Sequence, residues 1–300
     1  MSDFSWQDKY LAITPKPFAS MSILGSLYII KHVLSKPERR GAVFHRILLG
    51  LSIYDFVSSI AMFLGSWPIP RGSPGVYLAG GNDATCSAQG FFVQLTVGTP
   101  LYNASLATYY FLVVHLGWKE YQLREVEWAL HWLPNAFALV TAIAAAATGS
   151  YGNSKIWCWI VSSKDAFRLG FFYIPIWVSI VWTTVAMAVM YGGVAAQERK
   201  MRQYAQPRPA AASQPSTNAA ADASGTSRRQ VPAARTASQK MASQGLFYVL
   251  TFFLAWIFPS WTRIHQMIHG SIPFPVMALM AIFSPWQGWV LFVIFSVAVT

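Results

Sequence analysis

Long apolar stretches separated by short polar segments make up most of the chain. Seven of these stretches are long enough to cross the roughly 30 Å hydrocarbon core of a membrane as α-helices. They lie at 14–34, 44–67, 86–116, 128–149, 168–194, 241–269 and 274–299. The pattern predicts an all-α membrane protein, a bundle of seven transmembrane helices preceded by a short amino-terminal segment at residues 1–13.

Prolines recur inside the predicted spans, at Pro100, Pro175, Pro259 and Pro285. Within a membrane a proline kinks a helix rather than ending it, because neighbouring groups satisfy the carbonyl that loses its partner. Such a kink is either tolerated for packing or used as a hinge. The sequence leaves both interpretations open.

The positive charges between the spans predict the orientation of the bundle. With the amino end outside, Lys and Arg residues on the inner side number five at the first loop, two at the second and eight in the long loop. The outer segments hold six. Because lysine and arginine concentrate on the cytoplasmic side, we expect the amino end outside, the carboxyl end inside, and the plasma membrane as the location.

The longest polar segment, residues 195–240, joins the fifth and sixth predicted spans. It is rich in Ala, Ser, Pro and Arg and poor in bulky apolar residues, so it cannot bury enough surface to fold alone. We predict a disordered, basic intracellular loop. Its flanks next to the membrane would attract anionic lipids.

Composition agrees with a membrane protein and excludes one class of partner. Hydrophobic residues make up 54% of the chain and charged residues only 11%, whereas soluble domains carry roughly 25% charged residues. The net charge of +11 raises the possibility of nucleic acid. The Lys and Arg residues, however, stand in short blocks between apolar runs and form no basic face for a duplex. We therefore predict no nucleic-acid partner.

The two cysteines lie on the same predicted side of the membrane. Cys86 begins the third span, and Cys158 lies in the loop between the fourth and fifth. Both face an oxidising compartment in this topology, which favours a disulfide over two free thiols. The bond would hold the second outer loop across the top of the third span, as a lid over a cavity.

Four motifs, in their order along the chain, resemble the G-protein-coupled receptors, nearest their cyclic-AMP-receptor-like and secretin-like branches. They are LSIYDF in the second span, WCW around Cys158, FFLAWIFPSW in the sixth span and SPWQGW in the seventh. Gln287 and Gly288 match a Gln-Gly pair that both branches carry in the last span. The resemblance covers about residues 20–299, and it implies a heterotrimeric G protein as the intracellular partner.

Other features depart from the best-known receptor branches. The third span ends in VVHLGW, where the rhodopsin-like branch has an acidic-Arg-aromatic triplet, and SPWQGW replaces that branch's Asn-Pro signature. The large hormone-binding domain of secretin-type receptors does not fit in an amino end of about 15 residues. We also expect a further segment after Thr300.

Asp55 is the only acidic residue inside a predicted span. A carboxylate there is costly, so it should face the bundle interior and find partners. It is either a structural hydrogen-bond hub or a hub whose partners change between states, and the resemblance places it in a central polar network. We predict this polar core from Asp55, Asn103, Pro259, Gln287 and Gly288.

A candidate ligand site lies near the predicted outer face. Thr96 and Thr99 belong to a polar stripe at helical spacing in the third span. Arg263, near Trp261 and His265 in the outer part of the sixth span, has no obvious acidic partner within the spans. It would either reach the lipid headgroups or anchor an anionic ligand group. His265 and His269 are four residues apart, yet an exposed helix end is favoured over a metal site.

Three other classes of seven-helix protein are less consistent with the sequence. A retinal-binding pump needs a lysine in the last span, and residues 274–300 contain none. A zinc-dependent hydrolase would need histidines at depth, and a small-solute transporter would show an internal repeat. We predict a receptor without enzymatic activity or cofactor, with an extracellular ligand for which an anionic small molecule is one candidate; a transporter is the principal alternative.

Overall fold

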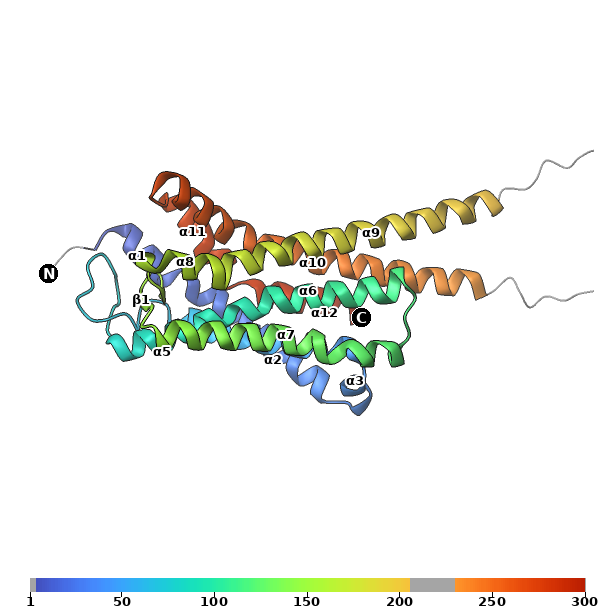
Figure 1. The fold of residues 1–300 in the computed structure, drawn as a ribbon, viewed down its shortest axis with the longest axis horizontal. Helices are drawn as coiled ribbons and strands as arrows, with labels where there is room; N and C mark the ends of the chain where they lie inside the picture. The colour runs from blue at the N-terminus through green and yellow to red at the C-terminus, as the bar shows by residue number, and fades with distance from the viewer. Residues whose placement is uncertain (1–3, 206–229, 300) are drawn as a thin grey trace, which may run out of the picture.

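The apolar stretches form α-helices that run side by side along one long axis (Figure 1). The computed structural model describes residues 4–205 and 230–299. Within them the α-helices are α1 (Trp6–Ile13), α2 (Pro15–Leu34), α3 (Pro37–Gly41), α4 (Val43–Leu64), α5 (Asp83–Gln94), α6 (Gly98–Tyr110), α7 (Glu120–Ala147), α8 (Asp165–Arg168), α9 (Ile174–Ala205), α10 (Gln230–His269), α11 (Phe274–Phe283) and α12 (Gln287–Val299).

Among the described residues, four helical stretches are long and apolar enough to cross a membrane: Trp6–Leu34, Val43–Leu64, Glu120–Ala147 and Ser162–Gly193. A fifth is added if α11 and α12, which meet at 44°, count as one bent span. The surfaces of these helices are apolar as well, with Val178 and Val181 of α9 each 62% exposed. Such surfaces are costly in water and suited to lipid, and the chain is a multi-pass membrane protein.

The helical stretch at the amino end begins before the predicted start of the first span, because residues 6–13 are helical and run almost directly into α2. A capping box starts α1: the Ser5 hydroxyl accepts from the Asp8 amide, and the Asp8 carboxylate accepts from the Ser5 amide. These bonds satisfy amides that the first helical turn leaves free. Polar residues such as Asp8 and Lys9 end the apolar pattern without ending the helix.

The stretch predicted as the third span, 86–116, is not one regular helix. A 3₁₀ turn, η1 (Leu95–Val97), separates α5 from α6, and a π-helical turn, η2 (Phe111–His115), follows α6. Pro100 explains the first break, since it has no amide to donate to the carbonyl four residues earlier in the chain. Pro285 has the same effect between α11 and α12, where the helix bends as the sequence predicted.

The helices on either side of the long loop extend further than predicted. The structure continues α9 to Ala205 and begins α10 at Gln230, so residues 195–205 and 230–240 are helical rather than disordered. Residues such as Ala, Gln, Glu, Lys, Arg and Met favour helix even where they are too polar to extend a membrane span. The remainder of the predicted loop, 206–229, lies outside the described residues.

Small residues bring the first and last helices of the bundle together. A side chain at Gly25 of α2 would come within 2.9 Å of the Gly288 carbonyl in α12. Beside this crossing, the Trp289 amide donates to the Ser22 hydroxyl at 3.1 Å. Close approach of backbones at glycine and serine is a common way to pack helices in lipid. Gly288 therefore has a packing role, at the position where the sequence predicted a polar core.

Candidate ligand-binding site beneath the β-hairpin

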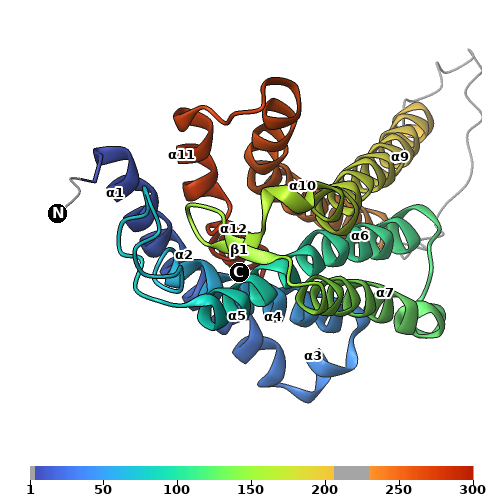
Figure 2. The same cartoon turned by 60° about the vertical axis from the view of Figure 1, so that its left-hand side comes forward.

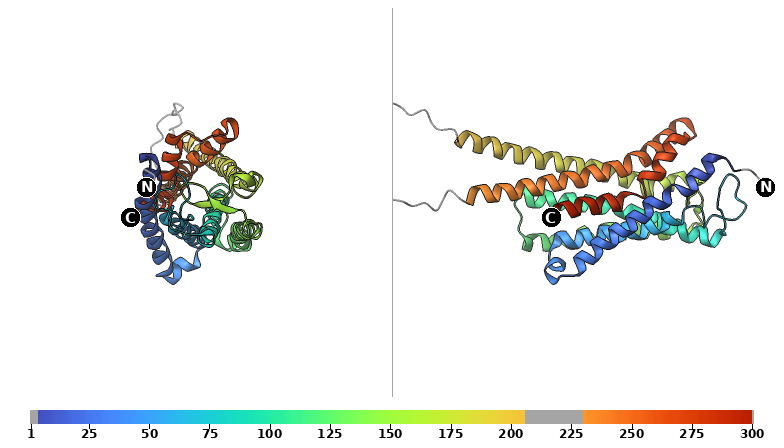
Figure 3. Two further views of the ribbon diagram at one scale, coloured as in Figure 1. Left: turned by 90° about the vertical axis from the view of Figure 1, so that its left-hand side faces the viewer. Right: turned by 180° about the vertical axis from the view of Figure 1, so that it is seen from behind.

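A two-stranded hairpin lies across one end of the bundle. Strands β1 (Tyr151–Asn153) and β2 (Cys158–Ile160) pair antiparallel, with Tyr151 opposite Ile160. Figure 2 and the end-on view of Figure 3 show the hairpin over the middle of the helices. All three residues of β2 are buried. We call this the hairpin end of the bundle; the carboxyl end of α12 lies at the opposite end (Figure 1).

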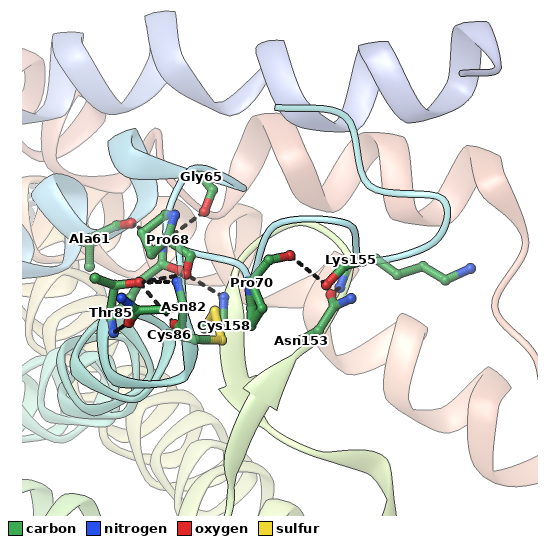
Figure 4. The surroundings of a disulfide bond; sticks show 12 residues. Ala61, Gly65, Pro68, Pro70, Asn82, Thr85, Cys86, Asn153, Lys155 and Cys158 are labelled. Atoms are coloured by element: carbon green, nitrogen blue, oxygen red, sulfur yellow. Dashed lines mark hydrogen bonds between the residues drawn. A yellow bond between two sulfur atoms is a disulfide. The ribbon is translucent and has the colours of Figure 1, made fainter. Parts of the chain in front are cut away.

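The hairpin is attached to α5 at three points. Cys158 of β2 and Cys86 of α5 form the predicted disulfide, with a Cα–Cα distance of 5.3 Å (Figure 4). Gln89 accepts from the Cys158 amide at 2.8 Å and donates to the carbonyls of Ala61 and Gly65 at the end of α4.

The third attachment is made by Gln94, which accepts from the indole of Trp159 at 3.0 Å and donates to the Phe171 carbonyl. Cys86, Gln89 and Gln94 are all buried on the same side of α5. The two glutamines therefore hold the hairpin through buried side-chain amides whose oxygen and nitrogen atoms are all hydrogen-bonded. No sequence motif indicated this role.

An inner cavity of about 40 Å³ lies directly beneath the hairpin. It has room for a few water molecules but not for an organic ligand. Its lining includes three residues predicted from the sequence, Thr96, Pro259 and Gln287. The polar atoms Thr96 Oγ1 and Trp256 Nε1 are buried at this cavity without a hydrogen-bond partner among the described residues. Such groups require polar atoms from water or a ligand.

An outer vestibule of about 410 Å³ opens above the inner cavity, between the hairpin and the ends of α10 and α11. Its volume is in the range of small-molecule sites. Both spaces are lined by Trp157, Trp159, Tyr173 and Met280, so these four side chains form the layer that separates them. The aromatic members come from the KIWCWI segment and from the π-helical turn η4 (Leu169–Tyr173).

Arg263 is not the unpaired cation that the sequence suggested. Its Nη1 and Nη2 donate to the two carboxylate oxygens of Asp165 in α8, at 2.8 and 2.6 Å. Nη1 also reaches the Gln266 side chain at 3.2 Å, and the guanidinium stands 5.5 Å from the ring of Tyr173. The ion pair joins α10 to α8 beside the vestibule, and Arg263 lines neither cavity.

The other predicted ligand residues are scattered. Trp261 is 51% exposed on the outside of α10, and the His265 ring is hydrogen-bonded to the Ser271 carbonyl at 2.9 Å. Neither lines the inner cavity or the vestibule. Among the described residues no group of three His, Cys, Asp or Glu side chains is placed to hold a metal ion. Thr99 is fully buried in α6, and the Asn103 amide donates to its carbonyl at 3.0 Å.

Asp55 lies in the interior of the bundle, as predicted, with the side chain of Thr99 as a polar neighbour. It is 4% exposed, and its Oδ2 has no hydrogen-bond partner within residues 4–205 and 230–299. The hydroxyls of Ser52, Ser58 and Thr99 are also buried, and none of them makes a hydrogen bond among the described residues. Buried polar atoms without a strong hydrogen bond can exchange partners when helices move.

On the receptor function that the sequence resemblance implies, replacing Asp55 with Asn is expected to leave the amount of protein at the cell surface unchanged and to alter signalling. The amide keeps the shape of the side chain and removes the buried charge. Surface labelling and nucleotide exchange on a G protein measure the two effects. Asp83→Asn, the same change at an exposed position, is the control. Equal signalling by the two variants and the wild type would restrict Asp55 to a structural role.

A second polar cluster lies between α4, α6 and α7, nearer the opposite end. Arg46 makes a bidentate ion pair with Glu127, and the ring of His131 lies between Glu127 and the hydroxyl of Tyr102. Asn135 donates to the same hydroxyl at 2.8 Å. The spacing of Glu127, His131 and Asn135, one helical turn apart, could have indicated a polar face in the sequence.

The described helices, with a disulfide-linked hairpin over one end, share their overall fold with solved structures. One of these structures is the crystal structure of squid rhodopsin, with a TM-score of 0.72 at 14% sequence identity. The match covers 99% of this chain and 83% of the rhodopsin chain. No protein-family model and no curated protein sequence matches the chain. The similarity is therefore one of fold.

Proposed function

We propose that the protein is a G-protein-coupled receptor, which carries the signal of an extracellular ligand to a heterotrimeric G protein. The observation that carries the proposal is the rhodopsin-like fold with a vestibule beside a disulfide-linked hairpin. Among the receptor branches, the motifs LSIYDF, WCW, FFLAWIFPSW and SPWQGW favour the cyclic-AMP-receptor-like and secretin-like ones.

In this proposal the helices form seven spans of the plasma membrane: α1–α2, α4, α5–η2, α7, α8–α9, α10 and α11–α12. The hairpin end faces outward, where an oxidising environment maintains the Cys86–Cys158 bond. The far ends of α9 and α10 face inward, in agreement with the basic residues of the segment that joins them. The G protein would bind at these ends, next to anionic lipid.

The mechanism follows from the layer between the two cavities. A ligand in the vestibule touches Trp157, Tyr173 and Met280, whose other sides line the inner cavity together with Trp256 of α10. A shift of this layer acts on α10 next to Pro259, where the helix lacks one backbone hydrogen bond. A ligand that binds better when the inner ends of α9 and α10 separate raises the population of that state.

The proposal is tested by nucleotide exchange with purified protein in lipid nanodiscs. Added heterotrimeric G proteins of several subtypes should take up a labelled GTP analogue faster than with empty nanodiscs, and a compound screen should find ligands that change this rate saturably. If no subtype responds to the protein, with or without compounds, and proteoliposomes instead accumulate a solute, the receptor assignment is wrong and a transporter replaces it.

A further inference from the structure

Arg168 is a buried cation at the vestibule, and the two terminal nitrogens of its guanidinium have no hydrogen-bond partner among the described residues. The residue is only 7% exposed. Its Nε donates to the Ile160 carbonyl of β2 at 2.7 Å, and its guanidinium stands 5.3 Å from the ring centroid of Trp159. Neither Nη atom donates to any other residue in the described part of the chain. The two contacts hold the flat group in place and leave its terminal nitrogens at the vestibule.

The charge around the vestibule is positive. Lys155, at the tip of the hairpin, also lines it and extends away from the disulfide (Figure 4). None of the described residues that line the vestibule is acidic. The nearest carboxylate, Asp165, gives both of its oxygens to Arg263. Asp165 acts on the charge of Arg168 only through space and is not hydrogen-bonded to it. An anion from outside that bonds directly to the guanidinium would therefore be attracted to this position.

The other residues that line the vestibule indicate the chemical class of the group that carries the anion. Trp157, Trp159 and Tyr173 present aromatic surface to the vestibule, and Met277 and Met280 present flexible apolar surface. An arginine whose Nε is already used offers two parallel N–H groups, a geometry that matches the two oxygens of a carboxylate. We propose that the vestibule binds a small aromatic carboxylate, with Arg168 as its anchor. This proposal rests on the proposed receptor function and specifies the class of its ligand.

Ligand-observed NMR titration of the purified protein in nanodiscs tests the site, with indole-3-acetic acid as the probe. For a molecule of this size a dissociation constant on the order of 1 mM is expected. Indole-3-acetamide, which has the same body without the charge, should bind at least about tenfold more weakly. Equal binding of the acid and the amide, tighter binding of phenyl phosphate than of the acid, or no saturable binding of the acid would each overturn the proposal.

The variants separate the anchor from the fold. Arg168→Gln should weaken binding of the acid at least about tenfold and leave the weak binding of the amide unchanged. Arg168→Lys keeps the charge and should recover part of the affinity, which shows that the site is still formed. Lys164→Gln, at an exposed position four residues earlier that does not line the vestibule, should bind the acid like the wild type. If Arg168→Gln, folded as judged by thermal unfolding, binds the acid equally well, Arg168 is not the anchor.

The titration contains no G protein, so the two proposals can fail separately. Arg168-dependent binding of the acid without any receptor-dependent nucleotide exchange would disprove the receptor function and keep the carboxylate site. Receptor-dependent nucleotide exchange with no preference for the acid over the amide would keep the receptor function and disprove the carboxylate site.

Discussion

Replacing both Cys86 and Cys158 with alanine is expected to lower the free energy of unfolding by about 4 kcal/mol. The bond closes a loop with a sequence separation of 72 residues, and a closed loop of this length removes that much conformational entropy from the unfolded chain. The two sulfurs are buried beside Ile69 and Val76, so alanine adds no polar group. Thermal unfolding of the purified variant and wild type, in the same nanodiscs, measures the difference.

Reduction of the wild type is the matched control for this prediction. Because the effect comes from closing the loop, a reductant should destabilise the wild type to about the level of the double variant and leave the variant unchanged. Gln89 and Gln94 should still hold the hairpin on α5 at low temperature, since their bonds do not depend on the sulfurs. A double variant as stable as the wild type would mean that these glutamines alone determine the position of the hairpin.

The sequence predicted the features that depend on local pattern or on a unique pair. Apolar runs located the helices, Pro285 marked a bend, and the two cysteines had only each other as partners. Helix ends were placed less well, because hydropathy follows side chains whereas a helix continues wherever backbone bonds and caps allow it. The capped start of α1 at Ser5 is one such end.

The site depended on contacts between residues far apart in the chain, which a pattern does not reveal. Arg263 looked unpaired because its partner, Asp165, precedes it by 98 residues in a segment that reads as a hydrated loop. Arg168 belonged to the same segment, yet β2 and Trp159 bury it. Where each loop folds back over the bundle is set by the disulfide and by Gln89 and Gln94, so the vestibule became visible only with the tertiary structure.

For the Arg263–Asp165 pair, we expect that replacing the more exposed partner destabilises the protein more than replacing the buried one. Arg263 is 1% exposed and Asp165 is 52% exposed by side chain, so a simple rule would assign the larger effect to Arg263. We expect the opposite: Asp165→Ala should destabilise the protein by about 2–3 kcal/mol, and Arg263→Met by less. Removing the carboxylate leaves a buried cation with little compensation. Removing the cation leaves a carboxylate that water can reach. The flexible apolar side chain of methionine fills the space that the arginine leaves.

A double-mutant cycle on unfolding free energies tests this asymmetry. Arg263 already has a buried Nε without a partner among the described residues, so once Asp165 is lost its charge depends on Gln266 and on the face of Tyr173. The double variant, Asp165→Ala with Arg263→Met, should therefore be more stable than Asp165→Ala alone, because the stranded charge is gone. Lys164→Ala, at the exposed neighbouring position, should change stability by no more than about 0.5 kcal/mol. Additive effects of the two single substitutions would show that water reaches Arg263 as soon as Asp165 is removed, and that the pair joins α8 to α10 only loosely.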